Sequence, residues 1–357
     1  MRFIIRFALY FLLFAGLTFK VFGQEVPGRA WKYQARPLQA GWDPVKLDLL
    51  KKYLIDSTFI TGFMVVQHGE VVFEYGDVEE NSYIASCRKS VLAILYGAHI
   101  KTGEINLHAT LRELGIDDVG GLLPQEKGAT VEDLLSARSG VFHPASYPGD
   151  YLDQAPKRGS VEHGTYWLYS NWDFNVAGYI FEKQTHQNIY DEVERVLAIP
   201  LQMQDWNRSL QHKEGDSSKS KYLAYPMWFS TRDMARIGLL MLNKGRWARK
   251  QLIDSGWVAE MVKAKTDYRE INHNVTIFRG MDYSLGYGYL WWIWQNMKDK
   301  KFNGAYSALG SMGQSISVFP AEDVVIAYKT KAAYQRANSL LQRFKVITLA
   351  LNAADKP

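Results

Sequence analysis

The residues with the clearest potential for chemistry are Ser86 and Lys89, which lie three positions apart in the segment Ser-Cys-Arg-Lys. They open an apolar run with helical periodicity up to Ile100, and residues at i and i+3 share one face of a helix. The N-terminal amides of a helix favour negative charge that develops nearby. A lysine desolvated by apolar neighbours has a lowered pKa and can accept the proton of a serine hydroxyl. The pair is therefore predicted to act as nucleophile and base.

The spacing alone predicts little, because a second pair, Ser218 and Lys221, has the same separation. This pair lies in the polar stretch Gly-Asp-Ser-Ser-Lys-Ser-Lys, which has no helical periodicity and no apolar residue that could desolvate an amine. We interpret it as a solvated loop. The first pair differs, because Tyr83 and Ile84 precede it and a buried helix is predicted to follow it.

A second candidate motif is Tyr169-Ser170-Asn171, the only Tyr-x-Asn in the chain, which stands just before a helical pattern. A tyrosinate, or a tyrosine that shares a proton with Lys89, could relay protons to a leaving group. The amide of Asn171 could hold a substrate carbonyl. Packing of Tyr169 among its aromatic neighbours in the sequence is the alternative interpretation.

A third candidate is the stretch Gly310-Ser311-Met312-Gly313-Gln314, which leads into a predicted strand. Glycines at such a position let a substrate approach the backbone closely. A simple turn at the entry of the strand is the alternative.

Other familiar signatures are missing from the sequence, namely GxSxG, HExxH, GxGxxG after a strand, and GxxxxGK[ST]. The eight histidines are scattered singly, so a metal site would need ligands from distant positions. The single cysteine, Cys87, has no partner for an intrachain disulfide. We expect Cys87 to pack at the start of the helix, because no histidine partner that would activate it can be identified.

Patterns in the first third of the chain predict the elements around the serine. Asp43 can cap a helix over residues 43–54, with proline in its first turn. The β-branched and aromatic runs 63–66 and 70–75, joined at His68-Gly69, predict an antiparallel hairpin. From residue 101 to 265 strand patterns are scarce, and helical patterns occur at 130–137, 174–184, 189–199 and 231–242.

Strand patterns return in the last third, at 286–294, 304–308, 314–319 and 323–330, and a final helix is predicted over 334–351. Strands at both ends with helices between them predict an α/β (α+β) fold in which both termini build one lobe. We expect that lobe to comprise residues 24–100 and 266–357. Residues 101–265 are expected to form a helical lobe.

The composition of the 357 residues, 47% hydrophobic, 14% aromatic and 22% charged, indicates a globular protein. Residues 1–23 have the pattern of a signal peptide, with two early arginines, an apolar run and small residues before a cut ahead of Gln24. An uncleaved anchor is the alternative, although the apolar run is short for a membrane span. We therefore expect a periplasmic or secreted protein without a stable membrane span.

Removal of residues 1–23 leaves 39 basic and 37 acidic residues. Binding to nucleic acid requires a clustered excess of basic residues, which the mature chain lacks. The charge balance therefore gives no reason to expect a nucleic-acid partner. The sequence does not indicate an oligomeric state.

The three motifs, in this order, resemble those of the serine β-lactamase and penicillin-binding-protein superfamily. The resemblance is strongest to its class C-like branch of esterases, amidases and 6-aminohexanoate-oligomer hydrolases, and it runs from about residue 41 to residue 351. It implies a β-lactamase/transpeptidase-like fold, with an antiparallel sheet flanked by terminal helices and an inserted helical lobe. Stretches outside the motifs agree: LLSARSGV (134–141), PLQM (200–203), FSTRDMARIGLLMLNKGRW (229–247) and GQSISVFPAEDVVIAY (313–328).

The resemblance implies that Ser86 is the acylated nucleophile and Lys89 its base. Tyr169 would be the proton relay to the leaving group and toward the deacylating water. It also implies a small-molecule ester or amide substrate, and neither a metal nor an organic cofactor.

Substrate contacts are implied for Asn171 and for the third motif, that is Ser311, Gly313 and Gln314. The backbone amides of Ser86 and Gln314 would form the oxyanion hole, since Gln314 follows the glycine of that motif. Such donors contribute about 2.7 to 4 kcal/mol each in acyl transfer.

Ser311 departs from the family pattern, because β-lactamases and peptidases of this superfamily have Lys or His at that position to hold a substrate carboxylate. The change favours neutral esters or amides, unless a cation comes from elsewhere in the chain. The residues considered for that role are Arg138, Lys157, Arg158 and Arg279. Tryptophans that would suit an apolar acyl group are Trp167, Trp172, Trp291, Trp292 and Trp294.

The leading hypothesis is therefore a secreted or periplasmic serine hydrolase that cleaves an ester or amide through an acyl-enzyme. One alternative is a penicillin-recognising D-Ala-D-Ala peptidase or weak β-lactamase. Another is a non-catalytic sensor or binding protein that keeps the fold. The presence of Ser86, Lys89, Tyr169 and Asn171 argues against it, because a degenerate member would be expected to lack one of them.

Overall fold

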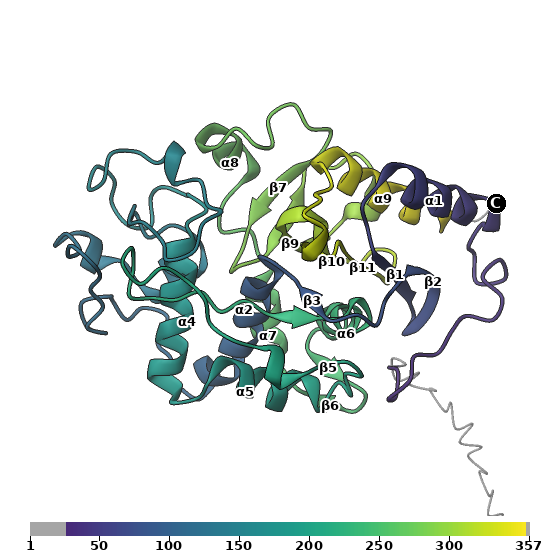
Figure 1. The fold of residues 1–357 in the computed structure, drawn as a ribbon, viewed down its shortest axis with the longest axis horizontal. Coiled ribbons are helices and arrows are strands. Elements are labelled where there is room, and N and C mark those ends of the chain that lie inside the picture. The colour runs from purple at the N-terminus through teal and green to yellow at the C-terminus, as the bar shows by residue number, and fades with distance from the viewer. Residues whose placement is uncertain (1–25, 355–357) are drawn as a thin grey trace, which may run out of the picture.

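The computed structural model describes residues 26–354, so the predicted signal segment 1–23 lies outside the described residues. At the centre of the described part is a seven-stranded sheet whose paired neighbours are antiparallel (Figure 1). The strands follow the order β2-β1-β11-β10-β9-β8-β7. Their bounds are β1 Gly62–Gln67, β2 Glu70–Gly76, β7 Ser284–Tyr287, β8 Trp292–Gln295, β9 Tyr306–Gly310, β10 Gln314–Phe319 and β11 Val324–Lys329.

The predicted N-terminal hairpin is present as β1 and β2. His68 and Gly69 have φ angles of 52° and 80°, the left-handed conformations that a tight two-residue hairpin turn requires. On its other side β1 pairs with β11, with Gly62 opposite Lys329. The first strands and the last strands of the chain therefore form one continuous sheet, as the order of the predicted elements indicated.

The single strand predicted over residues 286–294 is wrong, because the chain reverses there and forms β7 and β8. Gly288 donates its backbone N–H to the carbonyl of Trp291, and Leu290 has a φ of 59°. A Cβ atom at Gly288 would lie only 2.2 Å from the carbonyl oxygen of Met261. Close packing against a distant segment therefore bends the chain here, and the local aromatic pattern does not report such a contact.

Some helices pack on the sheet, and others belong to the middle of the sequence. The helix predicted over 231–242 matches α6 in full. The helix predicted over 334–351 begins six residues later than expected, at Leu340, where Ser339 caps its N-terminus in a capping box with Gln342. The α-helices are α1 Pro44–Ser57, α2 Cys87–Lys101, α3 Val131–Leu135, α4 Asn171–Thr185, α5 Ile189–Val193, α6 Thr231–Leu242, α7 Ser255–Met261, α8 Tyr268–Asn274 and α9 Leu340–Ala353. A π-helical turn, Glu194–Ala198, continues α5, and two short strand pairs are β3 Ser82–Tyr83 with β4 Trp228–Phe229 and β5 Arg246–Trp247 with β6 Lys250–Gln251.

Helices cover both faces of the sheet (Figure 1). On one face α1 and α9 pack together, and Phe344 of α9 contacts Trp294 of β8 and Phe302. On the other face α6 packs on β1, β10 and β11, and α2 packs on β9 and β10. Helix α6 thus lies on the sheet although its sequence belongs to the segment 101–265 that was expected to form the helical lobe. The antiparallel sheet with flanking helices confirms the predicted fold class.

Most of α2 is enclosed by protein, as its apolar faces predicted. Besides the sheet it packs against α4, α5 and α7, and nearly all of its residues are buried. The N-terminus of α2, with Ser86 at the N-cap, therefore opens at the junction between the sheet and the helices of residues 101–265.

Two features are absent from residues 26–354. No helix in this range is long and apolar enough to cross a membrane. No group of three or more His, Cys, Asp or Glu side chains in this range is placed to hold a metal ion.

Gly238 in α6 generates a prediction about the packing of this helix on the sheet. A Cβ atom there would lie 2.4 Å from Cγ1 of Val325, so we expect Gly238→Ala to lower the free energy of unfolding by about 1–3 kcal/mol. The control is Gly256→Ala in the first turn of α7, where a Cβ atom would lie 3.0 Å from Oδ1 of the N-cap residue Asp254 and would meet no backbone. That side chain can shift, so we expect a change of less than about 1 kcal/mol. Urea denaturation measures both variants, and equal stabilities would contradict the close approach of α6 to β11.

Candidate active site

Ser86 stands in a tight turn between β3 and α2. Ala85 directly before it has a φ of 49°, an uncommon left-handed conformation for a residue with a side chain. The turn is held by the N–H of Ile84, which donates to the carbonyl of Met227. Ser86 is the N-cap residue of α2, but its hydroxyl makes no capping hydrogen bond. The hydroxyl is therefore free to interact with Lys89, as the spacing of the two residues predicted.

Lys89 lies between the other two predicted catalytic side chains. Its Nζ donates to Oγ of Ser86 over 2.9 Å and to Oη of Tyr169 over 2.8 Å. The same Nζ lies 4.4 Å from the centre of the Tyr169 ring and 4.7 Å from that of Phe174. The structure thus brings Ser86, Lys89 and Tyr169 together in one hydrogen-bonded group.

The surroundings of Lys89 favour a neutral amine. Burial lowers its pKa well below the ordinary value, and the positive charge of the neighbouring Arg88 lowers it further. The carboxyl of Asp150 acts in the opposite direction, but Lys89 forms no ion pair with it or with any other residue of the described chain. A lysine in this state can accept a proton, which is the function that its position beside Ser86 requires.

Tyr169 is enclosed by aromatic rings. It stacks on Trp292 with ring centres 5.7 Å apart, and Phe174 meets it edge-on at 4.8 Å. Burial raises the pKa of Tyr169 above its ordinary range. Of the two forms considered from the sequence, the structure therefore favours a neutral tyrosine that shares protons with Lys89 over a tyrosinate. The two interpretations of Tyr169 are therefore compatible, because its ring packs among aromatic residues while its hydroxyl contacts Lys89.

Asn171 is not among the residues that line the pocket next to Ser86. It is the first residue of α4, and its Nδ2 donates to the carbonyls of Tyr147 and Pro148 over 3.3 and 2.9 Å. The side chain is buried beneath the loop that carries those carbonyls. In this structure Asn171 fixes that loop, which leads to Tyr151 in the pocket, while its Oδ1 is buried without a hydrogen-bond partner. Its direct contact with substrate stays a prediction.

The third motif borders the nucleophile through its first residues. A Cβ atom at Gly310 would lie 2.7 Å from the carbonyl of Ile84, so the end of β9 directly contacts the turn before Ser86. Ser311 and Met312 line the pocket, and Met312 has a φ of 62°. The backbone N–H groups of Ser86 and Ser311 donate no hydrogen bond to any described residue.

The proposed role of Gln314 in an oxyanion hole is corrected by its position. Gln314 is fully buried and does not line the pocket. Its side chain donates to the carbonyls of Tyr83 and Thr330 over 3.0 and 2.8 Å and accepts from the N–H of Thr330 over 2.7 Å. Gln314 thus ties the segment before Ser86 to the end of β11. The residues of the motif that line the pocket are Gly310, Ser311 and Met312, because the chain forms a turn over Ser311–Gly313 before β10 begins at Gln314.

Gly313 has a structural reason to be glycine, although it does not line the pocket. Its φ is 108°, and a Cβ atom there would lie 2.8 Å from Nδ2 of Asn338. Asn338 in turn donates its N–H and its Nδ2 to the carbonyl of Met312. The segment before α9 therefore clamps the turn that presents Ser311.

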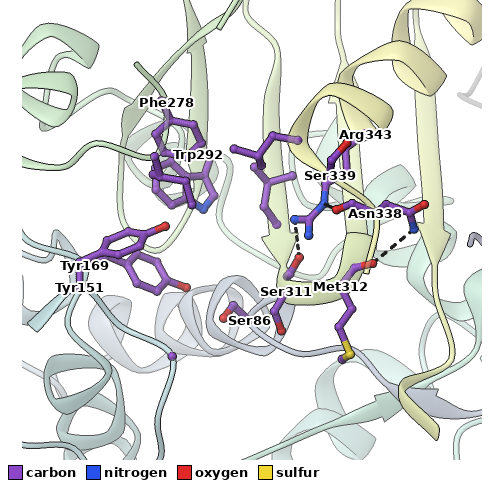
Figure 2. A pocket seen from close by; sticks show the side chains of 15 residues that line it. Ser86, Tyr151, Tyr169, Phe278, Trp292, Ser311, Met312, Asn338, Ser339 and Arg343 are labelled. Atoms are coloured by element: carbon purple, nitrogen blue, oxygen red, sulfur yellow. Dashed lines mark hydrogen bonds between the residues drawn. The ribbon is translucent and has the colours of Figure 1, made fainter. Parts of the chain in front are cut away.

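These residues surround a pocket of about 360 Å³ with Ser86 at its floor (Figure 2). One wall is apolar and aromatic, and the opposite wall comes from the third motif and the start of α9. The lining residues are Ser86, Gly149, Tyr151, Tyr169, Ile277, Phe278, Trp292, Leu309, Gly310, Ser311, Met312, Asn338, Ser339, Leu340 and Arg343.

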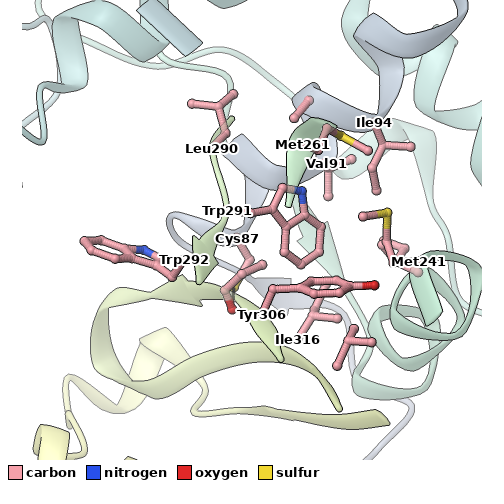
Figure 3. Close-up of a cluster of buried hydrophobic side chains, with 14 of the residues drawn as sticks. Cys87, Val91, Ile94, Met241, Met261, Leu290, Trp291, Trp292, Tyr306 and Ile316 are labelled. Atoms are coloured by element: carbon pink, nitrogen blue, oxygen red, sulfur yellow. Dashed lines mark hydrogen bonds between the residues drawn. The ribbon is translucent and has the colours of Figure 1, made fainter. Parts of the chain in front are cut away.

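Of the five tryptophans considered from the sequence, Trp292 alone lines this pocket. Trp291 points the other way, into the core between α2 and the sheet, where its ring meets Tyr306 edge-on (Figure 3). Cys87 lies in the same core, and burial raises the pKa of its thiol to about 12. Cys87 is therefore a packing residue and not a competing nucleophile.

The cation in the pocket is Arg343, which sequence reasoning missed. None of the four basic residues considered from the sequence lines the pocket. Arg138 pairs with Glu270, Arg158 pairs with Glu126, and Arg279 donates to backbone carbonyls. Arg343 lies in the predicted last helix, but nothing local in that helix distinguishes it from the other basic residues of the chain.

Comparisons with known proteins identify the family of the chain. The chain matches the family model described as Beta-lactamase over residues 60–344. It is similar in structure to a putative 6-aminohexanoate-dimer hydrolase from Bacillus anthracis, with 20% identity, a TM-score of 0.63 and coverage of 85% of this chain and 81% of that chain.

Two further solved structures are similar. One is a mutant simvastatin synthase from Aspergillus terreus, with 16% identity, a TM-score of 0.66 and coverage of 87% of this chain and 98% of that chain. The other is a family VIII carboxylesterase, with 13% identity, a TM-score of 0.61 and coverage of 92% and 100%. No curated protein matches. At these identities the similarity is one of fold, whereas the family model covers most of the sequence: the chain belongs to the beta-lactamase family and is a serine hydrolase.

Proposed function

We propose that this protein cleaves an ester or amide bond through an acyl-enzyme on Ser86. The observation that carries the proposal is the position of the Lys89 amine, which is within hydrogen-bond distance of both Ser86 Oγ and Tyr169 Oη. A base that touches the nucleophile, and a second group oriented by that base, are the requirements of nucleophilic catalysis by serine.

In acylation, Oγ of Ser86 attacks the substrate carbonyl carbon while neutral Lys89 accepts the hydroxyl proton. The carbonyl oxygen becomes an oxyanion, for which the unused N–H groups of Ser86 and Ser311 are the proposed donors. The bond to the leaving group then breaks, and Tyr169 gives that group a proton and is reprotonated by Lys89. An ester of Ser86 and a neutral Lys89 remain.

In deacylation, a water molecule attacks the acyl carbonyl in place of the leaving group. Tyr169 and Lys89 together accept the proton of the water, and the second tetrahedral intermediate uses the same N–H donors. Its collapse breaks the bond to Oγ of Ser86, returns the proton to that oxygen and releases a carboxylic acid. The neutral amine of Lys89 is restored at the end of the cycle.

A penicillin-recognising peptidase or weak β-lactamase is the second candidate, and Arg343 favours it. β-Lactams and peptides that end in D-Ala-D-Ala both carry a carboxylate. Arg343 places a cation in the pocket, although the third motif has Ser311 in place of Lys or His. Stable labelling by a fluorescent penicillin would support the second candidate. Cleavage of a short-chain p-nitrophenyl ester without a penicillin adduct would exclude the peptidase.

We also propose that the protein acts outside the cytoplasm, in the periplasm or after secretion. The support is the pattern of residues 1–23, which predicts cleavage ahead of Gln24.

Intact-mass spectrometry with a fluorophosphonate probe tests the nucleophile. We expect one adduct on the wild type and none on Ser86→Ala. The matched control is Ser218→Ala, which changes the exposed serine of the second Ser-x-x-Lys pair and should keep the adduct. No adduct on a folded wild-type protein would favour the non-catalytic binding protein, and the same spectra show whether the chain begins at Gln24.

The dependence of kcat/KM on pH tests the state of Lys89. Because the neutral amine is the active form, activity should rise with pH through the pKa of Lys89, on a limb well below the usual lysine range. Arg88→Met removes the adjacent positive charge, so the pKa of Lys89 should rise and this limb should move to higher pH. Arg88→Lys keeps the charge and serves as control; an unchanged limb in Arg88→Met would contradict the electrostatic role of Arg88.

Tyr169→Phe tests the proton relay by comparing two leaving groups. An amide or alkyl ester needs its leaving group protonated, so kcat/KM should fall by about 10²- to 10⁴-fold. A p-nitrophenyl ester departs without protonation, so its rate of acylation should fall less, and a product burst isolates that step. Equal losses of acylation for both substrates would mean that Tyr169 only positions Lys89.

A further inference from the structure

His143 is a buried histidine at the start of the loop that leads to the pocket. Only 3% of its surface is exposed, and it does not line the pocket itself. Its Nδ1 lies 2.8 Å from the carbonyl oxygen of Pro144, and its Nε2 lies 2.8 Å from that of Val119. A carbonyl oxygen only accepts hydrogen bonds, and a neutral imidazole has only one N–H. Both contacts are hydrogen bonds only when the ring carries two protons, so the geometry fits an imidazolium.

Asp118 supplies the negative charge that an imidazolium requires in this buried position. One of its carboxylate oxygens lies 3.7 Å from Nδ1 of His143, and the side chain of Asp118 is fully buried. The carboxylate accepts hydrogen bonds from four donors, namely the N–H groups of Val119 and Lys221, Nε1 of Trp172 and Oγ of Ser220. A carboxyl group that only accepts is ionised. His143 and Asp118 thus form a buried ion pair.

No other ionisable side chain within residues 26–354 forms a hydrogen bond or an ion pair with His143 or Asp118. Asp117, next in the chain, pairs with Lys127 over 2.7 Å. Burial raises the pKa of the nearby Tyr222 to about 12, so that group is neutral. The remaining charged groups on these segments are exposed or have donors elsewhere, namely Lys221, Asp150 with the N–H of Asn171, and Asp173 with Oγ of Ser139. The two members of the pair therefore neutralise each other.

The pair ties the start of the pocket-lining loop to α4 and to segments 117–122 and 220–222. From His143 the loop continues to Tyr151, which lines the pocket. The N–H of Tyr151 donates to the carbonyl of Tyr169 over 3.2 Å, and the centres of the two rings are 5.8 Å apart. Figure 2 shows these two rings together on one side of the pocket. The loop that begins at the ion pair therefore ends against the catalytic tyrosine.

We propose that His143 is a positioning residue of the active site, and that its imidazolium, neutralised by Asp118, holds the loop 143–151 against Tyr169. Loss of one ring proton would leave a nitrogen lone pair facing a carbonyl oxygen and a buried carboxylate without its counter-ion. The loop is therefore held firmly at low pH, and this contribution is lost as the pH rises. The inference rests on the proposed function for its kinetic test, whereas the charge of the ring does not depend on turnover.

The kinetic test compares wild type with His143→Gln, using p-nitrophenyl butyrate over the neutral and alkaline range. Glutamine keeps a hydrogen-bond donor but cannot carry the charge. At neutral pH we expect kcat/KM of the wild type to exceed that of the variant by about 10- to 100-fold, the cost of a small misplacement at a reacting centre. As the ring of the wild type loses its proton, this ratio should fall toward one.

A purely structural role of His143 would give a different result. Loss of folded protein, or of packing alone, would lower kcat/KM of the variant by the same factor at every pH. A ratio that is constant with pH, or a variant as active as the wild type, would therefore overturn the proposal. The matched control is His108→Gln, which changes an exposed histidine and should give a ratio near one throughout.

NMR of the wild-type protein labelled with [¹⁵N]histidine measures the charge of the ring without any variant. The ring signals of His143 are assigned through its backbone resonances. At neutral pH both ring nitrogens should have the chemical shifts of protonated nitrogens. That result would support the ion pair even if no ester were cleaved. One protonated and one unprotonated nitrogen would overturn the proposal even in an active hydrolase.

Discussion

The candidate active site depends most on the exclusion of water from the amine of Lys89. Lys89 is useful as a base only while it is uncharged, and the protein keeps it so by burying it between Tyr169 and Phe174 without a carboxylate partner. The two oxygens that contact its Nζ are both neutral hydroxyls. This arrangement costs stability, because an unpaired buried amine is unfavourable, and the large core around α2 offsets that cost.

The fold serves this site by joining distant segments around the N-terminus of α2. The hairpin of β1 and β2 pairs with the last strand, so that β9 and β10 bring the turn of Ser311 against the segment before Ser86. Gln314 connects that segment to the end of β11, and Asn338 clamps the turn from the other side. Of the three residues of the third motif that were expected to contact substrate, only Ser311 lines the pocket. Gly313 and Gln314 instead hold the turn of Ser311 in position.

The sequence was sufficient for features that depend on local pattern. The Ser86–Lys89 pair could be distinguished from the Ser218–Lys221 pair because an apolar helix follows only the first. The order of strands and helices predicted one lobe built from both termini, and the resemblance of the motifs to a known family implied the antiparallel sheet. The sequence was insufficient where contacts between distant segments determine the structure. Three such features are the reversal at Gly288, the burial of Gln314 and the position of Arg343 in the pocket. Family resemblance assigned the Gln314 amide to the oxyanion hole, but the path of the backbone determines which residues of the motif line the pocket.

The most direct test of the central claim is the titration of Lys89 itself, by NMR of the protein labelled with [ε-¹³C]lysine and with Lys89→Met to assign the signal. A midpoint well below the ordinary lysine value of about 10.4 would show that the amine is neutral when the enzyme works. A Lys89 signal that titrates together with the surface lysines would mean that the amine is charged beside Ser86, and it would contradict the role of Lys89 as the base.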